Sequence, residues 1–306
     1  MTIQEKLKII MQSLSLNQTQ LAQKIGVSFV TVNKWLNKRA LPRSKKETII
    51  NDLYIEATGQ KKVPDDYLLA KKSLVVSRSK KHNTLKEILG NPDIKESFFI
   101  KLTYHSNKIE GSTLSEKETE MVFRDIALPD KSLIEQLEAK NHQTALIYVF
   151  NYIFKQGKIN EKFILKIHSI LMNGIIENAG SYRNHAVRIV GANVPTANYI
   201  KISNLMNELE KDINKKSNDI IALVSDIHSR FEEIHPFSDG NGRTGRLIIQ
   251  AMLLKNNLAP AIIRQEKKHF YYTYLNNSQL KGDLTQLQDF ICDAILEGFD
   301  VLERGA

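Results

Sequence analysis

Residues 235–246 read His-Pro-Phe-Ser-Asp-Gly-Asn-Gly-Arg-Thr-Gly-Arg, and a mostly apolar run follows directly as far as Leu254. Such a run predicts a buried helix. The glycines before it let the backbone turn tightly and aim successive N–H groups inward, which makes an anion site at the N-terminus of a helix. The stretch therefore predicts a buried helix whose first turn binds an anion.

The side chains of this stretch suit phosphate chemistry. Arg243 and Arg246 carry guanidinium groups, which pair with phosphate oxygens through a planar fork. Asp239 offers the hard oxygen ligand that Mg²⁺ prefers beside a nucleotide. The imidazole of His235 is a suitable base for a hydroxyl nucleophile near pH 7. The alternative is a glycine-rich helix cap whose polar residues serve only the fold.

The stretch resembles the signature of Fic-domain proteins, HPFx[D/E]GNGRxxR, at every defined position. The resemblance implies transfer of AMP from ATP to a Ser, Thr or Tyr hydroxyl of a protein, which includes the chain itself. In that pattern His235 takes the proton of the target hydroxyl, and Asp239 holds Mg²⁺ between the α- and β-phosphates. The remaining contacts to phosphate are assigned to the backbone at Gly240 and Gly242 and to the side chains of Asn241 (α), Arg243 (β) and Arg246 (γ).

A second motif lies upstream, where residues 106–111 read Ser-Asn-Lys-Ile-Glu-Gly. Ser106 and Glu110 are four residues apart, so on a helix near 103–111 they share one face. The motif resembles the inhibitory [S/T]xxxE[G/N] motif of many Fic proteins, which implies an ion pair between Glu110 and Arg246. A carboxylate and a phosphate compete for the same bidentate donor, so this pair would hold ATP in an unproductive pose. The alternative is an exposed helix that Gly111 merely ends.

Two further segments are assigned from their order along the chain. Residues 180–195 switch to a strand-like alternation that ends in turn residues, and this segment, through about Tyr199, stands where the family has a β-hairpin flap over the active site. An unpaired edge there could capture an extended target segment. Phe270-Tyr271-Tyr272 resembles the adenosine side of the family's site, and Tyr272 is the residue expected to line the base. The buried patterns around His142, His168 and His228 favour structural histidines.

The first 62 residues hold eleven Lys/Arg against four Asp/Glu, so most of the net charge of +9 lies there. Residues 18–25 and 29–36 have helical spacing, Gly26 allows a tight turn, and Ser28 is a good N-cap. This region resembles a Cro/Xre-type helix-turn-helix with Trp35 in its core. Duplex DNA is therefore an expected partner, and the alternative is a module used for packing or dimerisation. The residues expected on the DNA face are Ser28, Phe29, Thr31, Asn33 and Lys34, with Lys38, Arg39 and Arg43 on phosphates.

Composition and spacing set the domain plan. We expect a helix-turn-helix domain at 1–58, a linker at 59–84, and a Fic domain at 85–306. The fold class expected is mainly α, with a helical core, a short β-hairpin flap and a small all-α domain. No apolar run reaches the roughly 20 residues that span a bilayer, there is no signal-peptide pattern, and Cys292 is the only cysteine. These features predict a cytoplasmic protein without membrane contact, and they leave a homodimer open.

Three functions fit the sequence. The leading hypothesis is an autoinhibited protein adenylyltransferase that uses ATP and Mg²⁺ and is fused to a DNA-binding module. The second is a DNA-binding regulator whose Fic core senses nucleotide, although such a protein need not keep both His235 and Arg246. The third is removal of AMP from a protein, in which Glu110 would position water. Forward and reverse chemistry use the same residues, so the sequence does not separate them.

Overall fold

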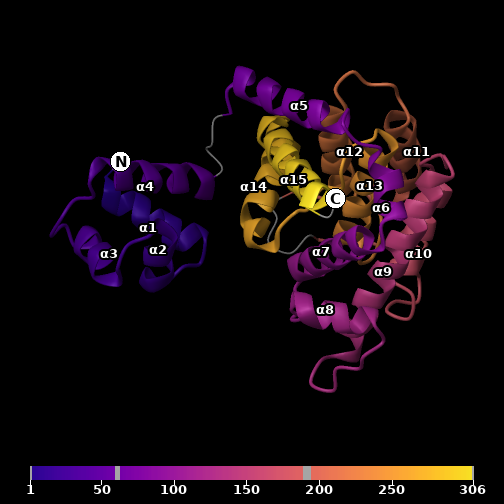
Figure 1. Ribbon diagram of the computed structural model, residues 1–306, viewed down its shortest axis with the longest axis horizontal. Coiled ribbons are helices and arrows are strands. Elements are labelled where there is room, and N and C mark those ends of the chain that lie inside the picture. Colours follow the sequence, from indigo (N-terminus) through magenta and orange to yellow (C-terminus); the bar gives the residue numbers. More distant parts are fainter. Residues whose placement is uncertain (1, 59–62, 189–193, 305–306) are drawn as a thin grey trace.

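The computed structural model describes residues 2–58, 63–188 and 194–304, and within these ranges it contains helices but no β-strand. A small N-terminal domain precedes a larger helical domain (Figure 1). The helices of the small domain are α1 (Ile3–Ser13), α2 (Gln18–Ile25), α3 (Phe29–Leu36) and α4 (Ser44–Ala57). The larger domain contains α5 (Asp65–Ser79), α6 (Thr84–Gly90), α7 (Pro92–Glu110), α8 (Glu116–Phe123), α9 (Leu133–Phe154), α10 (Glu161–Leu171), η1 (Tyr199–Lys201), α11 (Ile202–Ile213), α12 (Ile220–Ile234), α13 (Asn241–Lys255), η2 (Gln265–Lys267), α14 (Lys268–Lys281) and α15 (Thr285–Arg304).

The small domain has the expected helix-turn-helix at α2 and α3. Gly26 ends α2 in the left-handed region with φ of 71°, which glycine adopts without steric cost. Ser28 then caps α3 by accepting a hydrogen bond from the backbone N–H of Thr31. Val32 and Trp35 are buried in the core of this domain, as their spacing predicted.

The segment expected to be a linker contains a packed helix. Leu68 and Val75, seven residues apart, are buried on one face of α5, which packs against α15. The Lys71 ammonium lies 2.5 Å from the Asp289 carboxylate, and Arg78 lies 2.9 Å from that of Asp300. Residues 65–79 therefore belong to the larger domain.

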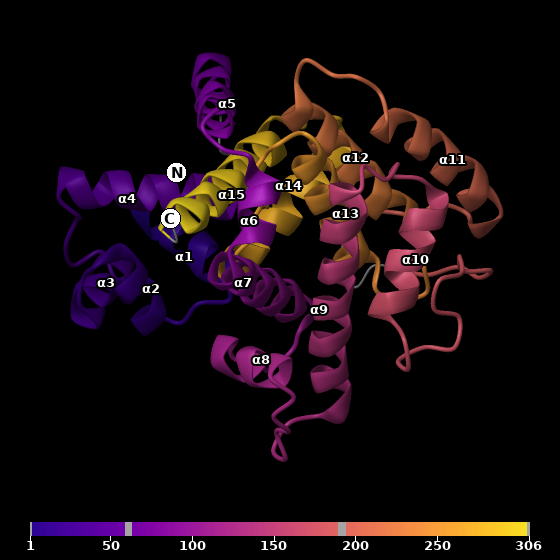
Figure 2. The same ribbon diagram turned by 45° about the vertical axis from the view of Figure 1, so that its right-hand side comes forward.

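Helix α13 occupies the centre of the larger domain. It packs against α7, α9, α10 and α12, and Figure 2 shows α9 and α10 beside it. Nearly every residue of α13 is buried. Within the described ranges, no helix is long and apolar enough to cross a membrane. The loop before α13 is thus fixed to a helix that is almost completely buried.

The expected β-hairpin flap is not observed in the described residues 182–188 and 194–199, and its tip at 189–193 lies outside them. The described parts are held by side chains instead of a strand ladder. The buried guanidinium of Arg183 donates to the carbonyl groups of His235 (2.8 Å) and Ala197 (2.6 Å). The Thr196 hydroxyl donates to the carbonyl of Val187 at 2.8 Å. Alternation along the sequence predicted the extended backbone here but not this side-chain anchoring.

Candidate active site

His235 lies directly after α12 in the left-handed region, with φ of 49°. Its Nδ1 is 3.3 Å from the carbonyl oxygen of Glu232. Because a carbonyl only accepts, this contact assigns the ring proton to Nδ1 and leaves Nε2 as the acceptor. Burial lowers the pKa of His235 below its ordinary value, and the Arg183 charge lowers it further. The imidazole is therefore neutral near pH 7, with one nitrogen ready to take a proton.

The loop after His235 is anchored in the core by Phe237 and His168. The two rings stack with centroids 3.7 Å apart and an angle of 4° between their planes. His168 Nε2 donates to the carbonyl of Asp239 at 3.0 Å, while its Nδ1 accepts from the N–H of Gly180 at 2.8 Å. Burial lowers the pKa of His168 to about 4. As its spacing predicted, His168 is a packed residue that holds the loop.

The Asn241 side chain is bonded to the backbone of the loop that precedes it. Its side-chain amide donates to the carbonyl of Phe237 at 2.9 Å, and its side-chain oxygen accepts from the N–H of Phe237 at 2.8 Å. Both ends of the amide thus close the loop on itself, and the side chain is buried. In this geometry Asn241 shapes the loop before α13, and its contact with the α-phosphate stays a prediction.

The first turn of α13 presents unused hydrogen-bond donors. The N-cap residue Gly240 has φ of 76°, and no side chain caps this helix, so its first N–H groups remain available to an anion. The Nε of Arg243 and the Nη1 of Arg246 are buried without a hydrogen-bond partner. A buried donor without a partner is costly, and phosphate oxygens would satisfy these groups.

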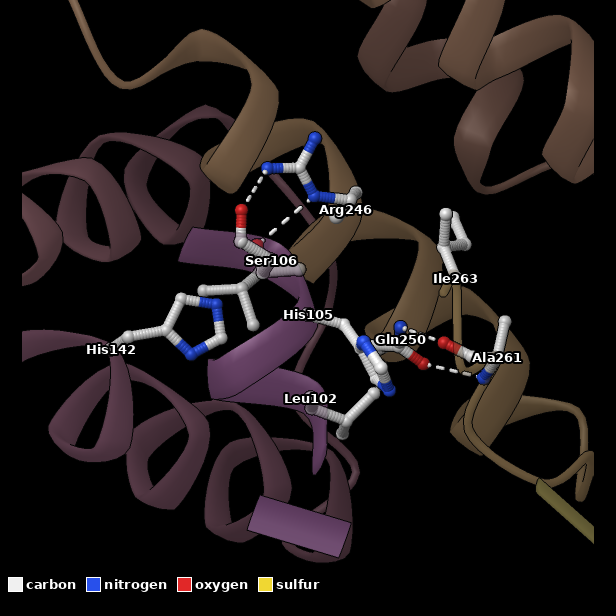
Figure 3. A pocket seen from close by; sticks show the side chains of 9 residues that line it. Leu102, His105, Ser106, His142, Arg246, Gln250, Ala261 and Ile263 are labelled. Carbon is white, nitrogen blue, oxygen red and sulfur yellow. Dashed lines mark hydrogen bonds between the residues drawn. The ribbon is translucent and has the colours of Figure 1, made fainter. Parts of the chain in front are cut away.

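The ion pair expected between Glu110 and Arg246 is present. Arg246 Nη2 lies 2.6 Å from Glu110 Oε1. Arg246 also donates from Nε to the Ser106 hydroxyl at 3.0 Å and from Nη2 to the Ser106 carbonyl at 3.1 Å, and Figure 3 shows Ser106 facing the guanidinium. Burial alone would raise the pKa of Glu110, but the Arg246 charge and hydrogen bond bring it below its ordinary value. Glu110 is thus an ionised carboxylate.

Gly242 supplies the space that this carboxylate fills. A Cβ at position 242 would collide with Glu110 Oε1 and lie 3.1 Å from Arg246 Nη1. A side chain here would therefore displace Glu110 or itself. The requirement for glycine at this position comes from close approach, since its φ is not in the left-handed region.

Two carboxylates near the arginines were not predicted from the sequence. Glu138 on α9 lies 2.6 Å from Arg243 Nη1 and fixes the direction of that guanidinium. Glu232 is buried against Gly245, its Oε1 has no hydrogen-bond partner, and burial raises its pKa to about 8. Glu138 is more than 100 residues from its partner, and Glu232 sits within an ordinary helical pattern, so no local signal could have revealed either.

A cleft of about 920 Å³ lies beside the loop after His235 and the first turn of α13. His235, Asp239, Gly240, Asn241, Gly242 and Glu110 line it, and α14 contributes Lys268 and Tyr272. The side chain of Asp239 is 61% exposed, so its carboxylate can reach a ligand in the cleft. Mg²⁺ typically takes one or two carboxylates plus substrate phosphates and water, and a single accessible aspartate fits that donor set. Tyr272 is 36% exposed with Lys268 Nζ 5.8 Å from its ring centroid.

The other buried histidines have structural contacts. His142 accepts or donates at Nδ1 with the Thr103 hydroxyl at 2.9 Å, and burial lowers its pKa to about 3. His228 Nε2 bonds to the Tyr271 hydroxyl at 2.7 Å, again with a pKa near 3 because of burial. Neither lines the cleft beside His235, in agreement with the structural roles expected for them.

The candidate DNA face on α3 is partly engaged within its own domain. The Ser28 and Thr31 hydroxyls lie 2.9 Å apart, and the Asn33 amide donates to Gln18 Oε1 at 3.1 Å. Lys34 and Phe29 are exposed. Val30, which the sequence reading did not select, is 57% exposed between them. The face therefore combines one charge with an exposed apolar pair.

The fold and the site define a mainly helical protein in which a neutral imidazole faces a cleft with unused anion donors. Residues 158–253 match the model of the Fic/DOC family, and residues 7–46 match a helix-turn-helix family. The larger domain thus contains a Fic/DOC domain at residues 158–253, and a helix-turn-helix precedes it in the chain.

Similarity to known proteins extends beyond these matches. The chain is 33% identical over 211 residues to protein adenylyltransferase Fic of Nematostella vectensis (65% of this chain, 47% of that protein) and 31% identical over 208 residues to that of Aedes aegypti (66% and 41%). It thus spans about half the length, or less, of these relatives. Fic-1 (residues 134–508) of C. elegans has the same fold, with a TM-score of 0.67, 20% identity, and coverage of 97% of this chain and 91% of that one.

Proposed function

We propose that this protein transfers AMP from ATP to a hydroxyl side chain of a protein and that Glu110 restrains the reaction. The observation that carries the proposal is the neutral imidazole of His235, with Nε2 unprotonated, in the same cleft as the uncapped N-terminus of α13. The relatives named protein adenylyltransferase Fic support the same reaction. ATP and a target protein with a Ser, Thr or Tyr are its substrates.

In this reaction His235 Nε2 takes the proton of the target hydroxyl as its oxygen attacks the α-phosphorus, and pyrophosphate leaves. The Nδ1 contact to the Glu232 carbonyl holds the ring in the tautomer this requires. The N–H groups at the start of α13 and the guanidinium of Arg243 bind phosphate oxygens, and Glu138 keeps Arg243 in place. Asp239 would hold Mg²⁺, which neutralises phosphate charge when bound.

The restraint follows from the contacts of Arg246. Its Nη2 is bound to Glu110, so the guanidinium is not free to bind the γ-phosphate. The Glu110 carboxylate also occupies the space beside Gly242 at the first turn of α13. Removing the carboxylate would free both, whereas Ser106 would still orient the guanidinium through Nε.

The decisive experiment incubates wild type and E110G with α-labelled ATP, Mg²⁺ and a cell lysate. We expect labelled protein bands from E110G that are weak with wild type and absent from the double variant E110G/H235A. If E110G labels no more than wild type, the restraint is wrong. If it labels nothing at all, the transfer itself is wrong.

Removal of AMP is the second candidate, because the Glu110 side chain is 32% exposed and lines the same cleft as His235. A carboxylate there could position water for attack on a protein-bound AMP. E110G would then lose activity on an AMP-modified protein, whereas it gains activity in the forward assay if the carboxylate is only a restraint.

For the N-terminal domain we propose binding of duplex DNA by α3. Lys34 and the basic residues after it would contact phosphates, with a steep dependence on salt because counterions are released. The intact protein should shift duplexes from a genomic pool at low salt, and failure to shift any of them would favour packing or dimerisation.

A further inference from the structure

The turn between α1 and α2 lies at the active-site cleft of the other domain. Ser13, Leu14 and Ser15 line this cleft together with His235 and Asp239. Leu14 packs against the cores of both domains. At the end of α4, which points toward α14 in Figure 1, the carbonyl of Ala57 accepts a 3.0 Å hydrogen bond from His269 Nε2. The small domain is thus seated against the cleft through the C-terminal ends of α1 and α4.

Ser15 is the most accessible hydroxyl of this turn. It is exposed, whereas Ser13 and Leu14 are partly buried. Its φ of 51° is in the left-handed region, and the N–H of Leu16 donates back to the carbonyl of Met11 at 2.9 Å, which closes the end of α1. Glycine is the residue that adopts this backbone at least cost. Ser15 therefore places a hydroxyl at a protruding point of the turn, on a cleft that contains a base.

We propose that the Ser15 hydroxyl accepts AMP in cis, so that the helix-turn-helix domain is a substrate of the enzyme to which it is joined. The inference rests on the function proposed above and names its acceptor. Ser15 Oγ would form a bond to the α-phosphorus of ATP, the bond from that phosphorus to the bridging oxygen of the β-phosphate would break, and pyrophosphate would leave. His235 Nε2 would take the Ser15 proton.

Position in one chain favours this acceptor over a free protein. A tethered group reaches an effective concentration of the order of millimolar, and correct orientation adds to the gain. The Leu14 contacts hold the turn at the cleft, so little chain entropy is left to lose. Modification should therefore be first order in protein, with a rate constant that does not change on dilution.

The charge of the product gives the modification a consequence for the small domain. Ser15 lies two residues before Asn17, the N-cap of α2. The side chain of Gln18, at the start of α2, is bonded to Asn33 on α3. A phosphodiester on Ser15 would thus add negative charge close to the face proposed to meet DNA phosphates.

The test uses full-length protein in the E110G background with α-labelled ATP, followed by peptide mapping of the adduct by mass spectrometry. We expect the adenylyl group on Ser15 and a first-order rate constant of modification that is unchanged by dilution. E110G/S15G should lose at least about nine tenths of the self-labelling, because glycine keeps the left-handed turn and removes only the hydroxyl. E110G/S44A removes an exposed hydroxyl of the same domain outside the cleft; it is the matched control and should label as strongly as E110G.

Labelling of lysate proteins separates this inference from the proposed function. If E110G labels lysate proteins but its own adduct is absent or lies on any residue other than Ser15, or if S15G leaves self-labelling unchanged, the inference is wrong and the proposed function stands. A first-order rate constant that rises in proportion to protein concentration would also overturn it, since the acceptor would then lie on another copy. If E110G labels neither itself nor the lysate, both fail.

Discussion

Two units of this chain, each a pair of helices joined by a turn (α2–α3 and α12–α13), have similar backbones but differ in how the first N–H groups of the second helix are satisfied. In the small domain, α2 ends at left-handed Gly26 and α3 begins at Ser28, whose own hydroxyl caps the new helix. In the larger domain, α12 ends at left-handed His235 and α13 begins after left-handed Gly240 with no side-chain cap. The first unit satisfies its donors internally and is complete as a fold. The second unit leaves N–H donors at the start of α13 without a side-chain partner, so that a ligand can bind them.

The largest effect on AMP transfer is expected from substitution of His235, the left-handed residue that ends α12 and is the proposed base. H235A should lower the rate of AMP transfer by about 10²–10⁴-fold, because a positioned base contributes roughly that much. ATP affinity measured by calorimetry should change little, since the ring contacts Glu232 and not the phosphate loop. Labelling at the wild-type rate would show that the left-handed imidazole serves only the turn.

Release of the restraint should have the next largest effect. A charge-assisted hydrogen bond contributes about 1.5–3 kcal/mol, so E110G should raise labelling roughly ten- to a hundredfold. E110G/R246A should lose most of this gain, because the freed guanidinium is then absent. E120Q, which removes a carboxylate from a surface pair with Arg124, is the control and should behave as wild type.

The third prediction concerns pH and the buried carboxyl of Glu232. The folded protein keeps its proton up to about pH 8, whereas the ordinary pKa is 4.5. The stability that Glu232 contributes is therefore complete below about pH 4.5 and falls as the pH rises toward 8, by up to about 1.4 kcal/mol per pH unit. E232Q does not titrate, so urea unfolding should find it increasingly stable relative to wild type across this window. A difference that does not vary with pH would contradict the buried, protonated state.

The smallest effect is expected from substitutions in the α2–α3 unit of the small domain. S28A should destabilise the small domain by about 1 kcal/mol, the usual contribution of an N-cap, while S28D, which retains an acceptor, should restore most of it. Neither should change AMP transfer by E110G, because the cap lies outside the cleft. A loss of transfer in S28A would show that the two units are coupled more closely than their contacts indicate.

The sequence predicted those features that are local or periodic. The turn at Gly26, the Ser28 cap and the buried Trp35 of the helix-turn-helix follow from local sequence and are all present. The Glu110–Arg246 pair spans 136 residues and came from motif resemblance, not from periodicity. Contacts without a motif were missed, such as Glu138 with Arg243.

The expected hairpin is not observed in the described residues, and the phosphate contact assigned to Asn241 stays a prediction. Alternating residues suggested the hairpin, and an amide in the signature suggested the phosphate ligand. In both cases a side chain bonded to backbone nearby in space: Arg183 to the carbonyl groups around His235, and Asn241 to Phe237. The hydrogen-bonding capacity of a residue can be read from a sequence, but its choice of partner depends on the fold.

Leu14, which packs against the cores of both domains, affects how often the two domains separate. Pulling the domains apart would expose only the part of the half-buried Leu14 side chain that packs on the larger domain, which is less than the roughly 1.5–3 kcal/mol of a fully buried leucine. By this contact alone the seated arrangement is favoured over the separated one by at most about tenfold, so separated molecules form a standing minority. Any ligand that prefers separated domains by a similar free energy would reverse the balance. L14A should move the population toward separation, which small-angle scattering would detect as a larger radius of gyration.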